Sequence, residues 1–137
     1  MKYLSIFLLV IFTSCNSQDK SNASNSEDFK ASIERGAKVY SSFCIACHLG
    51  SGKGVPRAFP PLANSDFLKE QRELSIKSIK YGQKGEIMVN GIKYNGVMAP
   101  MGLSDEEVAD VMNYITTNWG NENKKMITVE EVSKIKQ

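Results

Sequence analysis

Histidine, cysteine and long apolar runs are all scarce in this chain of 137 residues. The chain holds one histidine and three cysteines, so a zinc site built from two Cys/His pairs is excluded. The formal net charge is only +2, which argues against a nucleic-acid-binding domain, because such domains are strongly basic. The length fits one domain.

The longest apolar run covers residues 3–12 and follows Lys2. It is too short to cross a bilayer, which takes about 20 residues, and residues 1–14 are typical of an export signal. The signal leads into Cys15, which resembles the lipid-bearing cysteine of bacterial lipoproteins. An ordinary secretory signal is the alternative, but it would leave a reactive thiol in an oxidising compartment. We therefore expect an exported protein on the periplasmic side of the cell envelope, anchored to a membrane by lipid at Cys15.

The segment after Cys15 is polar and has almost nothing to bury. It predicts a lipid-anchored flexible tether over residues 15–26. One folded domain is then expected over residues 27–137.

Cys44, Cys47 and His48 form a Cys-x-x-Cys-His sequence, which is typical of a c-type haem attachment site. On a helix this spacing places both sulfurs on one face, where each can add to one vinyl group of a haem. A disulfide would leave His48 without a role, and a thioredoxin-like site would need strands on both sides of the motif. The sequence thus predicts one covalent haem c, with His48 near the iron. Because His48 is the only histidine, a second histidine ligand from this chain is excluded.

Apolar periodicity and capping patterns predict a mainly helical fold. An Asn-Gly pair between two β-prone runs predicts one small β-hairpin near residues 87–94, and a second Asn-Gly pair at 95–96 predicts a further turn. The expected helices cover residues 27–42, capped by Ser24, then 65–68, 72–81, 105–118, capped by Ser104, and a last short helix from Thr128.

Several motifs along residues 29–120 resemble class I, or monohaem, c-type cytochromes of the lipid-anchored bacterial type. They are Gly36 with Tyr40, the sequence 44–48, Pro60-Pro61-Leu62, Tyr94-Asn95-Gly96-Val97-Met98, and the run 103–108 leading to Tyr114-Ile115. The resemblance implies an all-α cytochrome c fold in which the N- and C-terminal helices cross, accompanied here by the hairpin.

The resemblance also implies roles for single residues. Cys44 and Cys47 would carry the thioethers, His48 would be the proximal iron ligand, the Pro60 carbonyl would accept its second N–H, and Leu62 would pack on the haem. Gly36 would let the two terminal helices approach closely at Tyr114. Met98 would be the distal ligand, with Met101 as its rival, because Ala99 interrupts the usual methionine–proline pair.

These roles imply an electron carrier and not an enzyme. The expected partners are a redox donor and a redox acceptor, such as a respiratory oxidase, a reductase or a dehydrogenase, and no nucleic acid. Lysines 53, 77, 80, 84 and 93 are candidates for the docking surface. The alternative is a haem enzyme or gas sensor, in which the distal site is open or the methionine is displaceable.

Overall fold

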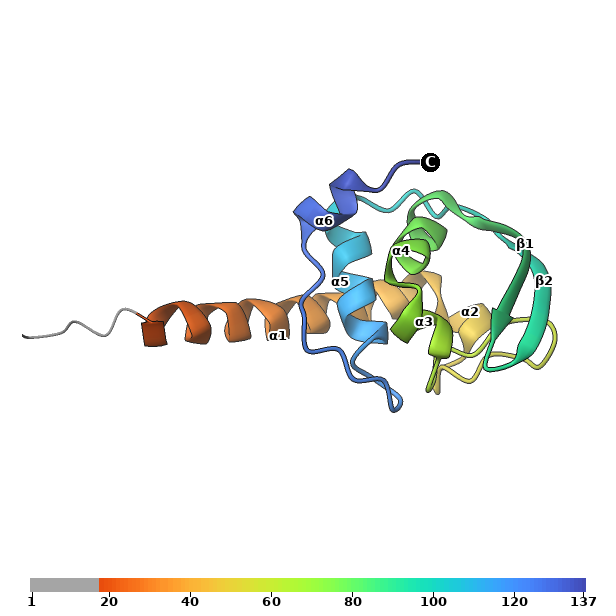
Figure 1. Cartoon of the computed structure of the whole chain (residues 1–137), viewed down its shortest axis with the longest axis horizontal. Coiled ribbons are helices and arrows are strands. Elements are labelled where there is room, and N and C mark those ends of the chain that lie inside the picture. The colour runs from red at the N-terminus through yellow and green to blue at the C-terminus, as the bar shows by residue number, and fades with distance from the viewer. Residues whose placement is uncertain (1–17) are drawn as a thin grey trace, which may run out of the picture.

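Helices make up most of the fold, and one two-stranded antiparallel hairpin accompanies them (Figure 1). The computed structural model describes residues 18–137, and their side chains from residue 25 onward. The predicted signal at 1–14 and Cys15 lie outside the described residues. No helix within residues 18–137 is long and apolar enough to span a membrane. The elements are α1 (Gln18–Phe43), α2 (Ile45–His48), α3 (Asp66–Glu70), α4 (Arg72–Tyr81), β1 (Gln83–Val89), β2 (Ile92–Met98), α5 (Asp105–Ile115) and α6 (Val129–Lys134).

The N-terminal helix α1 crosses α5 at Gly36, which confirms the predicted close approach. A Cβ built on Gly36 would lie 2.0 Å from the carbonyl oxygen of Asp110 and 2.9 Å from the Cβ of Tyr114. Only glycine leaves room for the α5 backbone at this point. Because α1 leads directly into the Cys-x-x-Cys-His segment, the crossing also places that segment against the core.

A buried polar network reinforces the crossing. The side chain of Asp110 is 5% exposed and accepts hydrogen bonds from Ser32 Oγ at 2.6 Å and from Arg35 Nε at 2.6 Å. Asn113 donates to Ser32 Oγ at 2.8 Å and to the Ile127 carbonyl at 2.8 Å, and accepts from the Ile127 N–H at 2.7 Å. A buried carboxylate is tolerated because it is paired and hydrogen-bonded. The network joins α1, α5 and the C-terminal segment.

Helix α5 lies at the centre of the core. The Ser104 side chain accepts from the Glu107 N–H, and the Glu107 carboxylate accepts from the Ser104 N–H, so the predicted capping box is confirmed. Apolar side chains recur on one face of the helix and are buried there. They are Val108, Val111, Met112 and Ile115.

The hairpin is longer than predicted. Asn90 and Gly91, with φ values of 51° and 72°, make the expected turn, which fits type I′. Asn95 and Gly96 do not turn the chain, so that prediction was wrong. They pair with Glu86 and Gly85 within the ladder, because β1 is long enough to give both a partner.

The tip of the hairpin is fastened to α3. The N–H of Asn90 donates to Asp66 Oδ1 at 2.7 Å, and the N–H of Asp66 donates to Asn90 Oδ1 at 3.0 Å. A two-stranded hairpin is marginally stable by itself. This reciprocal contact therefore helps to fix the position of β2.

Two predicted helix ends were wrong. Helix α1 begins at Gln18, not near Glu27, so Ser24 is not its cap and residues 18–26 of the predicted tether are helical. Extending a helix that packing already holds costs little, because nucleation is the expensive step. Helix α5 ends at Ile115 and not near residue 118, since the N–H of Thr117 bonds instead to the Tyr114 carbonyl, at 3.2 Å.

The C-terminal segment is held by Arg72. Thr128 caps α6 by accepting from the Glu131 N–H, and the Glu131 carboxylate pairs with the Arg72 guanidinium through contacts of 2.6 and 2.8 Å. Arg72 also donates to the carbonyls of Lys125 and Met126. The hydrogen bond from Arg72 lowers the pKa of Glu131 below its ordinary value, and partial burial opposes this shift.

Replacing Gly36 by alanine should destabilise the domain by about 2–4 kcal/mol, because the added methyl group overlaps the Asp110 carbonyl. Urea unfolding of the holoprotein measures this loss. Gly50→Ala is the matched control, since its Cβ would meet only the Ile45 side chain, at 3.8 Å. A Gly36→Ala protein as stable as the wild type would show that the two helices separate without cost.

The Arg72–Glu131 pair should stabilise the fold at neutral pH and lose its effect in acid. Since the folded pKa of Glu131 lies below the ordinary value of about 4.3, the contribution is complete above that value and disappears as the pH falls through the folded pKa. The free energy of unfolding of wild type and Glu131→Gln should therefore converge as the pH is lowered. A gap that stays constant with pH contradicts this.

Candidate functional site

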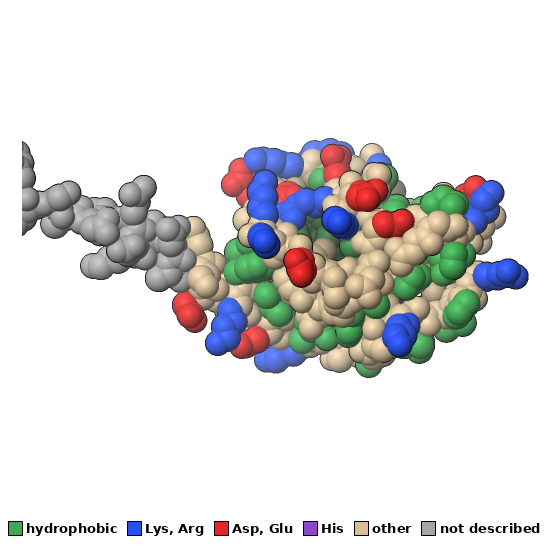
Figure 2. Space-filling view, turned by 60° about the horizontal axis from the view of Figure 1, so that its bottom comes forward, with side chains coloured by type: hydrophobic (Ala, Val, Ile, Leu, Met, Phe, Trp, Pro, Cys, Tyr) green, Lys and Arg blue, Asp and Glu red, His purple; other side chains and the backbone are tan. Residues whose placement is uncertain are grey.

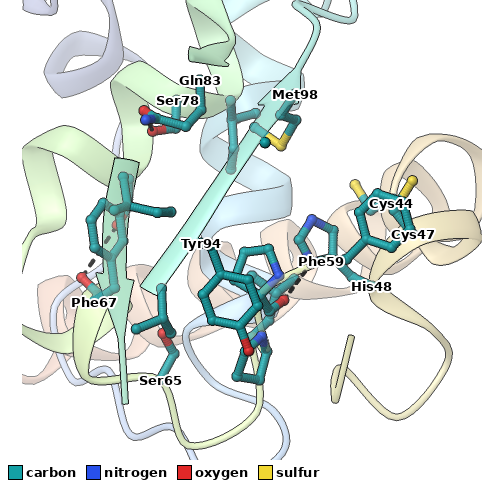
Figure 3. Close-up of a pocket in the computed structure, with 18 of the residues that line it drawn as sticks. Cys44, Cys47, His48, Phe59, Ser65, Phe67, Ser78, Gln83, Tyr94 and Met98 are labelled. Atoms are coloured by element: carbon teal, nitrogen blue, oxygen red, sulfur yellow. Dashed lines mark hydrogen bonds between the residues drawn. The ribbon is translucent and has the colours of Figure 1, made fainter. Parts of the chain in front are cut away.

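A cavity of about 370 Å³ opens between the Cys-x-x-Cys-His segment, α4, the hairpin and α5 (Figure 3). It brings together all six residues that the sequence singled out. They are Cys44, Cys47, His48, Pro60, Leu62 and Met98.

Cys44 and Cys47 lie at the edge of this cavity and form no disulfide with each other. The short helix α2 holds their spacing, because the N–H groups of Cys47 and His48 both bond to the Cys44 carbonyl, at 3.2 and 3.0 Å. Both sulfurs lie beside the His48 ring in Figure 3. Burial, with a smaller effect from Cys47, raises the pKa of the Cys44 thiol to about 11. The pair is available for two thioether bonds.

His48 is held by one hydrogen bond. Its Nδ1 lies 3.0 Å from the Pro60 carbonyl, so Nδ1–H donates and Nε2 remains for a metal ion. Burial lowers the pKa of His48, and the bond to Pro60 partly opposes this. The ring is therefore neutral at physiological pH, which is the form that binds iron.

The loop that carries Pro60 is closed by backbone contacts. A Cβ on Gly54 would lie 2.3 Å from the Phe59 carbonyl and 2.6 Å from that of Pro60, so the chain must pass itself closely here. The N–H of Leu62 donates to the Gly52 carbonyl at 2.7 Å. The side chain of Leu62 packs against the core and also lines the cavity.

Met98 ends β2 and reaches into the same space as the His48 ring (Figure 3). Met101 also lines the cavity, so both candidate distal ligands lie at the site. The other methionines with described side chains are placed elsewhere, since Met112 is fully buried in the core and Met88 is 51% exposed on the hairpin. Met126 does not line the cavity.

The walls of the cavity fit a haem, which is a large apolar ring that carries two carboxylates. Most of the lining is apolar, and a polar side is formed by residues such as Ser78 and Gln83. Residues 18–137 hold no cluster of three or more His, Cys, Asp or Glu side chains for another metal site. Sequence reasoning named only Leu62 as a packing residue and missed other lining residues. Among those it missed are Phe67, Ile79, Tyr94, Val111 and Ile115, of which Ile79, Val111 and Ile115 lie on the apolar faces of predicted helices.

The surface beside the cavity is partly apolar. Green side chains gather over the hairpin end of the domain, where Met88, Ile92 and Val97 are exposed (Figure 2). Two of the predicted docking lysines are engaged within the domain, since Lys80 pairs with Asp105 at 2.7 Å and Lys93 pairs with Glu86 at 2.9 Å.

Comparison with known proteins identifies the family of this chain. Residues 33–119 match the family described as Cytochrome c. The chain is 46% identical over 110 residues to cytochrome c-552 of Thermus thermophilus, covering 74% of this chain and 83% of that protein. It is 35% identical over 89 residues to cytochrome c6 of Gloeothece citriformis, covering 64% and 72%.

A larger relative contains a similar segment. The alcohol dehydrogenase (quinone), cytochrome c subunit, of Gluconacetobacter polyoxogenes is 31% identical over 115 residues, which cover 74% of this chain and 22% of the subunit. The chain belongs to the cytochrome c family, as a monohaem cytochrome that carries covalent haem c and transfers electrons.

Proposed function

We propose that this protein is a membrane-tethered electron carrier whose haem iron is bound by His48 and Met98. Cys44 and Cys47 would form the two thioether bonds. The observation that carries this proposal is the arrangement of His48, braced by Pro60 on one side, with Met98 at the same cavity. Two side-chain ligands leave no position for a substrate, which fits a carrier better than a haem enzyme.

The residues of the chain hold the ligands while an electron passes. Haem c supplies the chemistry, since its iron alternates between ferric and ferrous states. The Pro60 carbonyl fixes the tautomer and the plane of the His48 ring. The thioether of Met98 is a soft ligand, which raises the reduction potential. Apolar side chains, including Leu62, would keep water away from the haem ring.

Lipid at Cys15 would keep the carrier at a membrane surface. Confinement raises the effective concentration of the carrier near its partners, so that docking can be weak and fast. One relative is the cytochrome c subunit of an alcohol dehydrogenase (quinone). We propose that the partners of this chain are a redox donor and a redox acceptor of a respiratory or dehydrogenase chain. The apolar surface beside the cavity, formed by Met88, Ile92 and Val97, is a candidate docking face, and Lys84 lies on β1 of the same hairpin.

A second candidate function rests on the sequence Met98-Ala99-Pro100-Met101. Two methionines at one cavity make the distal ligand replaceable, and a displaced ligand would open the iron to a gas or a peroxide. This haem enzyme or gas sensor would share the covalent haem and the fold. Carbon monoxide binding separates the two functions.

The folded ferrous protein should not bind carbon monoxide at neutral pH, and the ferric protein should show a sulfur-to-iron charge-transfer band. Met98→Ala should abolish that band and allow carbon monoxide to bind, because the distal position loses its sulfur. Optical spectra of purified holoprotein measure both. Met101→Ala is the matched control and should keep the wild-type spectra. Carbon monoxide binding by the wild type contradicts the carrier, and reversed behaviour of the two variants assigns Met101 as the ligand.

Cells grown with labelled palmitate should attach label to the wild type but not to Cys15→Ser. The reason is that the thiol of the first mature residue accepts the lipid. Gel autoradiography with mass spectrometry of the mature N-terminus checks this, and the unlabelled variant should leave the membrane fraction. A mature wild-type chain that lacks Cys15 contradicts the anchor.

A further inference from the structure

Tyr40 contacts both ends of the segment that carries the haem motif. Its backbone carbonyl accepts the N–H of Cys44 at 2.9 Å, at the start of the motif. Its hydroxyl donates to the carbonyl of Leu49 at 2.6 Å, directly after His48. The residue is only 2% exposed. We call these two hydrogen bonds the Tyr40 clasp.

Leu49 adopts a conformation that almost only glycine takes freely. Its φ is 63° and its ψ is 160°, and a side chain with a Cβ persists there only when its surroundings hold it. This turn sends the chain back so that Gly54 N–H reaches the His48 carbonyl, at 3.0 Å, and Gly52 N–H reaches the Leu49 carbonyl, at 3.0 Å. The strained residue therefore sets the path from His48 towards Pro60.

Packing keeps the Tyr40 hydroxyl in place. The Tyr40 ring lies between two other aromatic rings, with centroid distances of 5.4 Å to Tyr114 and 4.9 Å to Trp119. Trp119 lies against Gly52, where a Cβ would approach the indole to 2.5 Å. The hydroxyl is thus positioned before it makes its bond, so little conformational entropy is lost in making it.

We propose that Tyr40 is a positioning residue for His48. The clasp holds Leu49 in its strained turn, and the turn holds His48 where its Nδ1–H meets the Pro60 carbonyl. The inference rests on the proposed function, in which His48 is the proximal ligand. It adds a residue that keeps this ligand fixed during electron transfer, although that residue does not line the cavity.

Hydrogen exchange of the His48 Nδ1–H tests the proposal. Proton NMR of the reduced holoprotein follows this hydrogen in wild type and in Tyr40→Phe, which keeps the aromatic ring. The exchange should become about tenfold faster in Tyr40→Phe, the size expected for one buried hydrogen bond, while the core amides of α5 change less. Tyr114→Phe is the matched control and should exchange at the wild-type rate, because its hydroxyl makes no hydrogen bond with the described residues.

A second pair of variants isolates the strain. Leu49→Gly removes the strain, because glycine adopts this backbone conformation freely. Adding Tyr40→Phe to Leu49→Gly should then change the exchange rate of the His48 Nδ1–H by less than about threefold. The double variant should fold even if Tyr40→Phe alone does not, and failure of both to fold overturns the proposal. An unchanged exchange rate of the His48 Nδ1–H in Tyr40→Phe also overturns the proposal. Equal acceleration of exchange at the core amides of α5 overturns it as well, because Tyr40 then only stabilises the fold.

The same spectra keep this test separate from the proposed ligation. Ring protons of His48 shifted by the haem establish ligation in the wild type. If they are absent, the proposed ligand set fails. Even in that case, the exchange rates of the His48 Nδ1–H in wild type and Tyr40→Phe report on the hydrogen bond between His48 and Pro60. The comparison therefore still decides whether the Tyr40 clasp maintains this bond.

Discussion

The close crossing of α1 and α5 at Gly36 is the constraint on which the rest of this structure depends. With no side chain at Gly36, the α5 backbone approaches α1 closely enough for Ser32 and Arg35 to bind the buried carboxylate of Asp110. The crossing fixes the direction of α1, and α1 leads directly into the haem motif. A local steric requirement in the N-terminal helix therefore decides where Cys44 and the residues after it meet the core.

The two sides of the cavity are held by different means. On the side of His48, backbone hydrogen bonds from Leu62 to Gly52 and from Gly54 to His48 close a loop, and the Pro60 carbonyl of this loop braces the imidazole ring. On the side of Met98, a hairpin supplies the candidate ligand, and its tip is fastened through Asp66 and Asn90. Hydrogen bonds between main chain and short side chains are rigid, which suits a protein whose iron changes charge while its ligands stay in place.

Much of the site was predictable because its chemistry is local. Cys44, Cys47 and His48 are spaced within one helical turn, and the cavity does contain all six residues that the sequence singled out. Polar contacts between distant segments were missed, including the Asp110 network and the pair of Arg72 with Glu131. Neither has a sequence spacing that marks it. Helix ends were also misjudged, because Ser24 and Glu27 resemble a cap whether or not the preceding residues continue the helix.

By itself, the sequence determined the cofactor, the helical class, the hairpin turn at Asn90 and the capping box at Ser104, since each depends on residues within a few positions of one another. Tertiary structure decided what the motif could not. It brought Met98 and Met101 to one cavity, engaged Lys80 with Asp105, and placed the hydroxyl of Tyr40 against Leu49. These contacts depend on how the helices pack, and packing brings together residues whose separation along the chain carries no signal.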